Sequence, residues 1–220
     1  MIGPATDDTL HICLNSGLQK LGLDLDESQR DTCLAYLDLL GEWNRAYNLT
    51  AIREPSALVA YHLLDSLAVL PFLHGKQCLD VGTGAGLPGL ILALADRDRH
   101  WRLIDSNRKR LRFVNQAILE LKLPNVETLH VRVEDLEPED NISTITVRAY
   151  GRLGRIWRDA GHLVGSGTHL LAMKSSKIKS ELAELASLPV KYRVHEIDVP
   201  GLDADRILIE IRRITEDGDD

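Results

Sequence analysis

The chain has 220 residues, 44% of them hydrophobic, so it can form a packed core and fits one main domain with a modest extension. Its formal net charge is −7, which speaks against nucleic-acid binding through bulk charge but leaves room for a local basic surface. No stretch approaches the roughly 20 apolar residues of a membrane span, and the start MIGPATDDTL lacks a signal-peptide pattern, so we expect a cytoplasmic protein with no membrane partner. Cys13, Cys33 and Cys78 form no CxxC pair, which argues against disulfides and a zinc site.

Residues 1–74 are predicted to form a helical extension packed on the rest of the chain. Apolar residues recur every three or four positions in TCLAYLDLLGEWNRAYNL, and Asp26 stands where the N-cap of this helix belongs. A further helix is predicted from about Ser56 to Leu73, with His62 and Asp65 on a face apart from its apolar stripe. Two candidate ligands do not make a metal site, so a structural hydrogen bond or a pocket wall is the preferred interpretation.

Residues 75–214 alternate short apolar runs with helical patterns, which predicts an α/β fold. QCLDV, WRLID, VETLHVR, ISTITVRAY and THLLAMK are predicted strands of a mostly parallel sheet covered by helices on both faces. KYRVHEIDV and RILIEIRRI are separated only by PGLDAD, which is too short for a crossover, so an antiparallel hairpin is predicted to end the sheet. Residues 215–220, TEDGDD, are predicted to be a disordered acidic tail.

The stretch CLDVGTGAGLPG follows the first predicted strand and contains a glycine-rich turn. A P-loop needs a lysine after its last glycine, and none follows here, so nucleoside triphosphate binding is excluded. Gly84, Gly86 and Gly89 match the GxGxxG fingerprint of dinucleotide sites, and Asp105 lies 19 residues after Gly86. A nicotinamide-dependent oxidoreductase is therefore one open interpretation.

Acidic residues at the ends of three predicted strands favour a cationic ligand instead. Asp80 is expected to point into the crevice beside the loop, where its charge disfavours a pyrophosphate. Asp105 can accept both hydroxyls of a ribose, and Glu134, expected at the end of the third strand, lies where an adenine would rest. For Asp135, helix capping is the preferred interpretation. S-adenosylmethionine, a nucleoside with a sulfonium and an amino group, fits this set better than a nicotinamide cofactor.

Six segments together resemble the bacterial 16S ribosomal RNA guanine-N7 methyltransferases of the RsmG (GidB) family, over most of the chain from Gly22 to Ile214. These segments are EWNRAYNLTAI, HLLDS, DVGTGAGLPG, LIDSNRKRLRFV, RVED and VRAYG. The resemblance implies a Rossmann-like class I methyltransferase fold with an N-terminal helical extension, S-adenosylmethionine as donor, and a guanine of 16S rRNA in the small ribosomal subunit as acceptor. An RNA-binding ribosome assembly factor that has lost activity remains a non-enzymatic alternative.

The resemblance also implies a set of site residues. The family's cofactor contacts fall on Gly82, Leu87, Val133, Glu134 and Arg148, and they join Asp80, Gly84 and Asp105 from the loop pattern. Arg148 and Lys174 are expected to position the substrate by holding guanine O6 or nearby phosphates. One departure from the family is Ser175, where glycine more often follows the lysine.

The expected chemistry needs no general base, because guanine N7 carries a lone pair and no proton. In-line placement of N7 against the methyl group in a water-poor site is then sufficient. No metal is expected, and a monomer is expected. N7 lies in the deep, narrow major groove of A-form RNA, so the target must be a loop or an extruded base.

Three basic segments on this acidic chain suggest one positive face for RNA, although solvated helix surfaces explain each of them equally well. The stretch 97–112 has seven Lys or Arg against two Asp; the other segments are Arg148 to Arg158 and Lys174 to Lys179. For Arg108 to Arg110, phosphate binding and a solvated face are both open. Binding to RNA should weaken steeply with salt. Trp43 and Tyr47 fit core packing better than stacking on a base.

Overall fold

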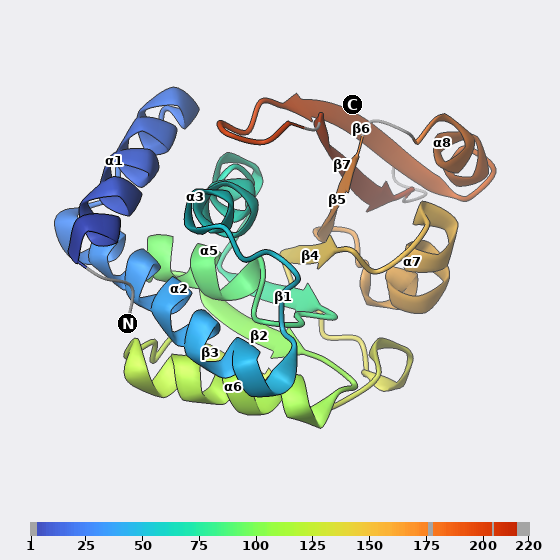
Figure 1. The fold of residues 1–220 in the computed structure, drawn as a ribbon. Coiled ribbons are helices and arrows are strands. Elements are labelled where there is room, and N and C mark those ends of the chain that lie inside the picture. The colour runs from blue at the N-terminus through green and yellow to red at the C-terminus, as the bar shows by residue number, and fades with distance from the viewer. Residues whose placement is uncertain (1–3, 176–177, 204, 215–220) are drawn as a thin grey trace.

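The computed structural model describes residues 4–175, 178–203 and 205–214, and its centre is a 7-stranded mixed sheet with helices on both faces (Figure 1). The strand order is β3-β2-β1-β4-β5-β7-β6; the pairs from β3 to β5 are parallel, and β7 runs antiparallel to β5 and β6. The strands are β1 (Gln77–Val81), β2 (His100–Ile104), β3 (Val126–Leu129), β4 (Thr144–Arg148), β5 (His169–Ser175), β6 (Val190–Ile197) and β7 (Arg206–Arg213). The predicted fold class is confirmed, including the terminal antiparallel hairpin.

The helices fill two layers, each with its own hydrophobic core cluster. One cluster joins the helices before β1, together with α5 and α6, to one face of the sheet, and the other joins α7 and α8 to the opposite face. The helices are α1 (Pro4–Leu21), α2 (Glu27–Tyr47), α3 (Pro55–Leu58), η1 (Val59–Leu64), α4 (Asp65–Leu67), η2 (Leu70–Phe72), α5 (Gly89–Ala95), α6 (Arg108–Glu120), η3 (Val133–Asp135), α7 (Leu153–Ala160), η4 (Gly161–Leu163) and α8 (Lys179–Leu185).

Helix α2 begins as its sequence predicts. The Asp26 side chain accepts a hydrogen bond from the Gln29 N–H at 2.8 Å, and the Gln29 side chain accepts one from the Asp26 N–H at 2.8 Å, which is a capping box. The Trp43 ring lies 5.9 Å from the ring of Phe113 on α6, so it packs in the core as preferred above.

The helix predicted for Ser56 to Leu73 differs from the observed segment in length and in burial. Elements α3, η1 and α4 form it, it ends at Leu67, and its middle turn η1 is a π-helix. His62 and Asp65 are buried together with the apolar residues of the segment. The apolar periodicity does not predict the burial of these two polar side chains, because their partners lie far away in sequence.

This region also corrects the expectation that no stretch is long and apolar enough to span a membrane. The stretch Pro55–Phe72 passes that test by length and composition, with a mean hydropathy of 1.3. It is 61% buried inside the protein, as expected for the core helix of a globular fold.

The end of the third strand is a second correction. Strand β3 stops at Leu129, and Glu134 lies beyond it on the short helix η3. The acidic tail predicted for residues 215–220 lies outside the described residues.

Candidate functional site

The loop after β1 has backbone geometry that requires its glycines. Gly82, Gly84 and Gly86 have φ angles of +67°, +59° and +84°, a region that side chains with a Cβ rarely adopt. A Cβ on Gly82 would lie 3.0 Å from the Tyr150 ring, and one on Gly86 would lie 2.3 Å from Leu90. At Gly84 the nearest atom to such a Cβ is the Gly82 carbonyl oxygen at 3.9 Å, so this side of the loop is open.

Asp80 lies behind this loop rather than in the crevice, which corrects the expectation for its side chain. It is fully buried, and its carboxylate accepts hydrogen bonds from the Thr83 hydroxyl at 2.5 Å, the Thr146 hydroxyl at 2.8 Å and the Gly89 N–H at 3.1 Å. Burial raises the pKa of the Asp80 carboxyl, and these three hydrogen bonds oppose the rise. The carboxylate therefore braces the strand, the loop and the start of α5 against one another.

Asp105 follows β2 directly and links the end of this strand to the glycine loop after β1. Its carboxylate accepts the Gly84 N–H at 2.9 Å and the Asn107 N–H at 2.7 Å, and it lies 3.6 Å from Arg110. The residue is 4% exposed. Each carboxylate oxygen has one lone pair beyond these backbone bonds, so the group can still accept hydroxyl donors.

The other predicted donor-site residues lie near this loop with different exposures. Leu87 and Val133 are buried, whereas Glu134 is exposed. The pKa of the Tyr150 hydroxyl is raised to about 12, first by burial and then by the charges of Asp159 and Glu134. Glu134 is therefore close enough to act electrostatically on the residue that packs against Gly82.

A cavity of about 400 Å³ lies at the carboxyl ends of β4 and β5, against the helical segment of the extension. That volume falls within the usual range for small-molecule pockets, about 300–1,000 Å³. Arg148 and Lys174, both predicted to position the substrate, line this cavity. Its other polar walls are Tyr61, His62, Asp65, Tyr150, Glu181 and Arg206.

A buried carboxylate holds two arginines in the wall of this cavity. Asp65, 1% exposed, lies 3.2 Å from Arg148 Nη1 and accepts hydrogen bonds from Arg206 Nε at 2.6 Å and Nη2 at 3.1 Å. Arg148 also donates to the Tyr61 carbonyl at 3.0 Å. Sequence reasoning missed Arg206, because a lone arginine at the start of a hairpin strand gives no local signal.

Lys174 has its partners within the protein. Its ammonium donates to the Gly151 carbonyl at 2.7 Å and lies 2.8 Å from a carboxylate oxygen of Glu181. Burial alone would raise the pKa of the Glu181 carboxyl, but hydrogen bonds from Lys174 and from the Leu153 N–H outweigh it and lower the pKa. Ser175, the departure from the family pattern, is exposed at the end of β5.

His62 is a neutral imidazole in the cavity wall. Its Nε2 lies 3.0 Å from the Thr50 hydroxyl, and its buried Nδ1 has no hydrogen-bond partner among the described residues. Burial, and then the charge of Arg148, lower the pKa of His62 to about 4. Sequence reasoning also missed Asn44. Its side-chain amide donates to the Thr50 carbonyl and accepts from the Thr50 N–H, both at 2.9 Å.

Ala149, directly after β4, has strained backbone geometry at the cavity floor. Its φ angle of +53° is unusual for a residue with a Cβ, and such strain gathers at functional sites. The segment VRAYG therefore turns sharply between Arg148 and Tyr150, whose ring lies against Gly82 of the glycine loop.

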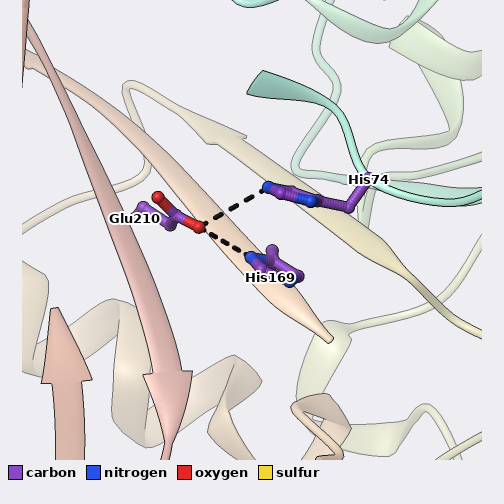
Figure 2. Close-up of side chains that lie close together, drawn as sticks. All are labelled: His74, His169 and Glu210. Carbon is purple, nitrogen blue, oxygen red and sulfur yellow. Dashed lines mark hydrogen bonds and ion pairs between the residues drawn. The ribbon is translucent and has the colours of Figure 1, made fainter. Parts of the chain in front are cut away.

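A second polar cluster lies at the amino end of β5, away from this cavity. The imidazoles of His74 and His169 stack 3.5 Å apart with 13° between their planes, and both face Glu210 (Figure 2). Glu210 also accepts from His195 at 2.9 Å. The spacing suits a metal ion, but nearly parallel rings do not direct their nitrogen lone pairs at one point, so the arrangement is that of a hydrogen-bonded cluster.

More side chains of the basic segments form ion pairs with acidic residues than the sequence suggests. Arg152 is ion-paired with Glu184, and Arg155 lies 3.1 Å from Asp159. Lys177 lies outside the described residues. Arg108 and Lys109 are exposed in the first turn of α6, where a cation opposes the helix dipole.

The chain matches the family described as "GidB: rRNA small subunit methyltransferase G" across residues 29–209. It belongs to this family. A ribosomal RNA small subunit methyltransferase G from Methylococcus capsulatus is 43% identical over 204 residues, covering 93% of this chain and 99% of the relative. One from Hahella chejuensis is 42% identical, covering 91% and 92% of the two chains. The chain is thus an rRNA small subunit methyltransferase, and neither the oxidoreductase nor the inactive assembly factor is favoured.

Solved structures place the methyltransferase in the class I fold. A SAM-dependent methyltransferase from Aquifex aeolicus aligns with a TM-score of 0.56 at 17% identity, covering 74% of this chain and 96% of that chain. The structure of M. jannaschii TYW2 in complex with AdoMet aligns with a TM-score of 0.53 at 14% identity, covering 68% and 75%. At these identities the likeness concerns the fold of the methyltransferase and not its substrate.

Proposed function

We propose that this enzyme transfers a methyl group from S-adenosylmethionine to N7 of one guanine in 16S rRNA of the small ribosomal subunit. The observation that carries the proposal is the combination of family membership with two adjoining sites. One is the glycine loop beside Asp105, and the other is the cavity lined by Arg148 and Lys174. Tyr150 contacts Gly82 of the loop and also lines the cavity, so it joins the two sites.

The residues of the first site fit the methyl donor. Asp105 is placed to accept the ribose hydroxyls, and the open side of Gly84 lets the ligand approach the backbone. Gly82, Leu87, Val133 and Glu134 complete the proposed donor pocket. Asp80 contributes indirectly, by holding the loop in shape from behind.

When bound, S-adenosylmethionine supplies an electrophilic methyl group on a sulfonium. In the proposed reaction the N7 lone pair would form the new bond to carbon while the bond from carbon to sulfur broke, and the positive charge would move from sulfur to the guanine. No proton leaves N7, so the protein's task is to orient the base and to exclude water.

The charges of the second site suit a base that becomes cationic. Asp65 neutralises one of the two guanidinium groups in its cluster, and Glu181 pairs with Lys174. Asp65 holds Arg148 in place, and the cluster keeps one net positive charge, with which Arg148 can contact guanine O6 or a phosphate. Arg108 and Lys109 are the exposed cations proposed to hold the RNA backbone.

The substrate implies a cytoplasmic enzyme, and we propose that it acts as a monomer without a metal ion. We also propose that residues 1–74 act as one extension that closes the acceptor side of the site. The sheet-bearing part, residues 75–214, then carries the donor pocket.

Methyl transfer from radiolabelled S-adenosylmethionine to small subunits that lack this modification tests the function. The label is mapped by strand cleavage at N7-methylguanine, with naked 16S rRNA and large subunits as parallel substrates. We expect label at a single guanine of the small subunit. Label on the large subunit only, or none anywhere while the donor binds, would overturn the proposal.

A further inference from the structure

Among the described residues that line the cavity, only His62 has a buried side-chain nitrogen or oxygen without a hydrogen-bond partner. The residue is 6% exposed, and Nδ1 has no hydrogen-bond partner within the described part of the chain. Buried polar atoms in native proteins are nearly always bonded, so an exception next to a cavity indicates a ligand that supplies the partner. The turn that carries His62 is π-helical, a geometry that is frequent at functional sites.

The contacts of Thr50 are compatible with the tautomer of His62 that carries its hydrogen on Nδ1. The Ile52 N–H donates to the Thr50 hydroxyl oxygen at 3.1 Å, so this oxygen already accepts one hydrogen bond. The hydroxyl proton is then free to point at His62 Nε2, 3.0 Å away. With Nε2 as the acceptor, a neutral imidazole has its hydrogen on Nδ1. In this tautomer His62 has an N–H donor at Nδ1, on a side chain that lines the cavity.

The cavity lies where the acceptor base must be. It is formed by the residues that follow β4 and β5, and Tyr150 separates it from the donor loop by one ring contact at Gly82. A base in this cavity would adjoin the glycine loop, at which we propose that the donor binds.

We propose that the cavity binds the extruded guanine and that His62 donates a hydrogen bond from Nδ1 to guanine O6. This inference rests on the proposed function. O6 is the neighbour of N7 on the same edge of the base, and adenine has an amino donor at that place, so this contact selects guanine. A neutral donor also adds no positive charge beside a base that becomes cationic. Nδ1 is closed to solvent in the base-free protein, so entry of the base includes a movement of the wall that uncovers it.

Two substitutions separate the role of Nδ1 from that of Nε2. In His62→Asn the side-chain amide nitrogen takes a position near Nδ1, whereas in His62→Gln it reaches toward Nε2 and Thr50. We expect His62→Gln and His62→Ala to lower kcat/KM on small subunits by about 30- to 100-fold, the cost of an unmade buried hydrogen bond. His62→Asn should stay within about tenfold of the wild type. The control His162→Asn alters an exposed histidine on η4 whose Nε2 lies 3.0 Å from the Leu136 carbonyl oxygen, and it should change nothing.

Donor affinity and thermal melting report folding, and a base analogue reports the contact itself. S-adenosylmethionine should bind all variants within about twofold of the wild-type Kd. Small subunits reconstituted with 2-aminopurine at the target keep N7 but lack O6. With these subunits, kcat/KM of the wild type should fall as far as His62→Gln lowers it on ordinary subunits. The kcat/KM of His62→Gln should be the same on both kinds of subunit.

The results distinguish this inference from the function on which it rests. If the wild type labels no guanine, the proposed function fails and the inference fails with it. If the wild type labels one guanine and His62→Gln keeps full activity, or His62→Asn is no better than His62→Ala, only the role of Nδ1 is overturned.

Discussion

At the scale of single residues, burial and hydrogen-bond partners give the acids that end β1 and follow β2 two different roles. The Asp80 carboxylate accepts hydrogen bonds from two hydroxyls and one backbone N–H, so it stabilises the conformation of the loop. Asp105 has backbone bonds only and lies beside the open Gly84, so it can still take a ligand's hydroxyls. The strand ends in the sequence identify both acids as site residues, but only the positions of distant threonines, such as Thr146, show which one faces the ligand.

Asp105→Ala should weaken S-adenosylmethionine binding by more than about tenfold, because hydrogen bonds to a charged group contribute about 1.5–3 kcal/mol. Isothermal titration of the full-length enzyme measures this. Asp96→Ala is the matched control, since Asp96 also follows a core element but bonds Arg99 at the opposite end of the sheet. An unchanged Kd for Asp105→Ala removes this residue from the donor site.

At the scale of elements, the sequence predicts the strands well and the helix of the extension poorly. Each of the seven predicted strands overlaps an observed one, although β3 ends at Leu129, earlier than predicted. Each buried strand carries its own signal in its composition. The helical segment around η1 carries an apolar signal of the same strength, yet its polar residues are buried. His62 and Asp65 are stabilised by Thr50, Arg148 and Arg206, and no local pattern predicts such long-range partners.

The buried His62 on η1 should make stability fall in mild acid. The unfolded chain binds a proton at this side chain near pH 6.5, whereas the folded chain does so only near pH 4. The unfolded state therefore binds more protons between these values, and stability that is complete above pH 6.5 is lost as the pH falls toward 4. At pH 5 the loss from this residue is about 2 kcal/mol.

Urea unfolding at pH 7 and pH 5 measures this loss as a difference between wild type and His62→Gln. The free energy of unfolding of the variant should fall less between the two pH values, by about 2 kcal/mol. Equal pH dependence in both proteins would mean that His62 titrates normally in the folded state.

At the scale of the whole molecule, one ion cluster ties together parts that are far apart in sequence. Asp65 begins α4, Arg148 ends β4 in the parallel part of the sheet, and Arg206 begins β7 of the terminal hairpin. Asp65→Asn should destabilise the enzyme by about 3–5 kcal/mol, because it leaves two largely buried guanidinium groups without their carboxylate. Urea unfolding measures the loss, and adding Arg206→Gln should restore part of it. A double variant as unstable as the sum of the single ones would show that the two residues do not interact.

The charge distribution over the whole molecule decides how an acidic protein can bind RNA. Within the described ranges, Arg148, Arg152, Arg155 and Lys174 all have acidic partners close by, so much of the basic sequence signal is neutralised inside the protein. Arg108 and Lys109 are exposed at the start of α6, at the edge of the sheet where the donor loop lies. We therefore expect few basic residues to bind RNA phosphates, and we expect them to lie close to the site.

Replacing Arg108 and Lys109 with Gln should lower the salt dependence of binding to small subunits without changing donor affinity. Each phosphate contact contributes about 0.7–0.9 to the slope of log K against log salt, so the double variant should lose about 1.4–1.8 from it. Equilibrium binding across a salt series measures the slope, and Arg97→Gln, an exposed arginine at the opposite edge of the sheet, is the control. If both variants keep the wild-type slope, the first turn of α6 is a solvated helix end and RNA is held elsewhere.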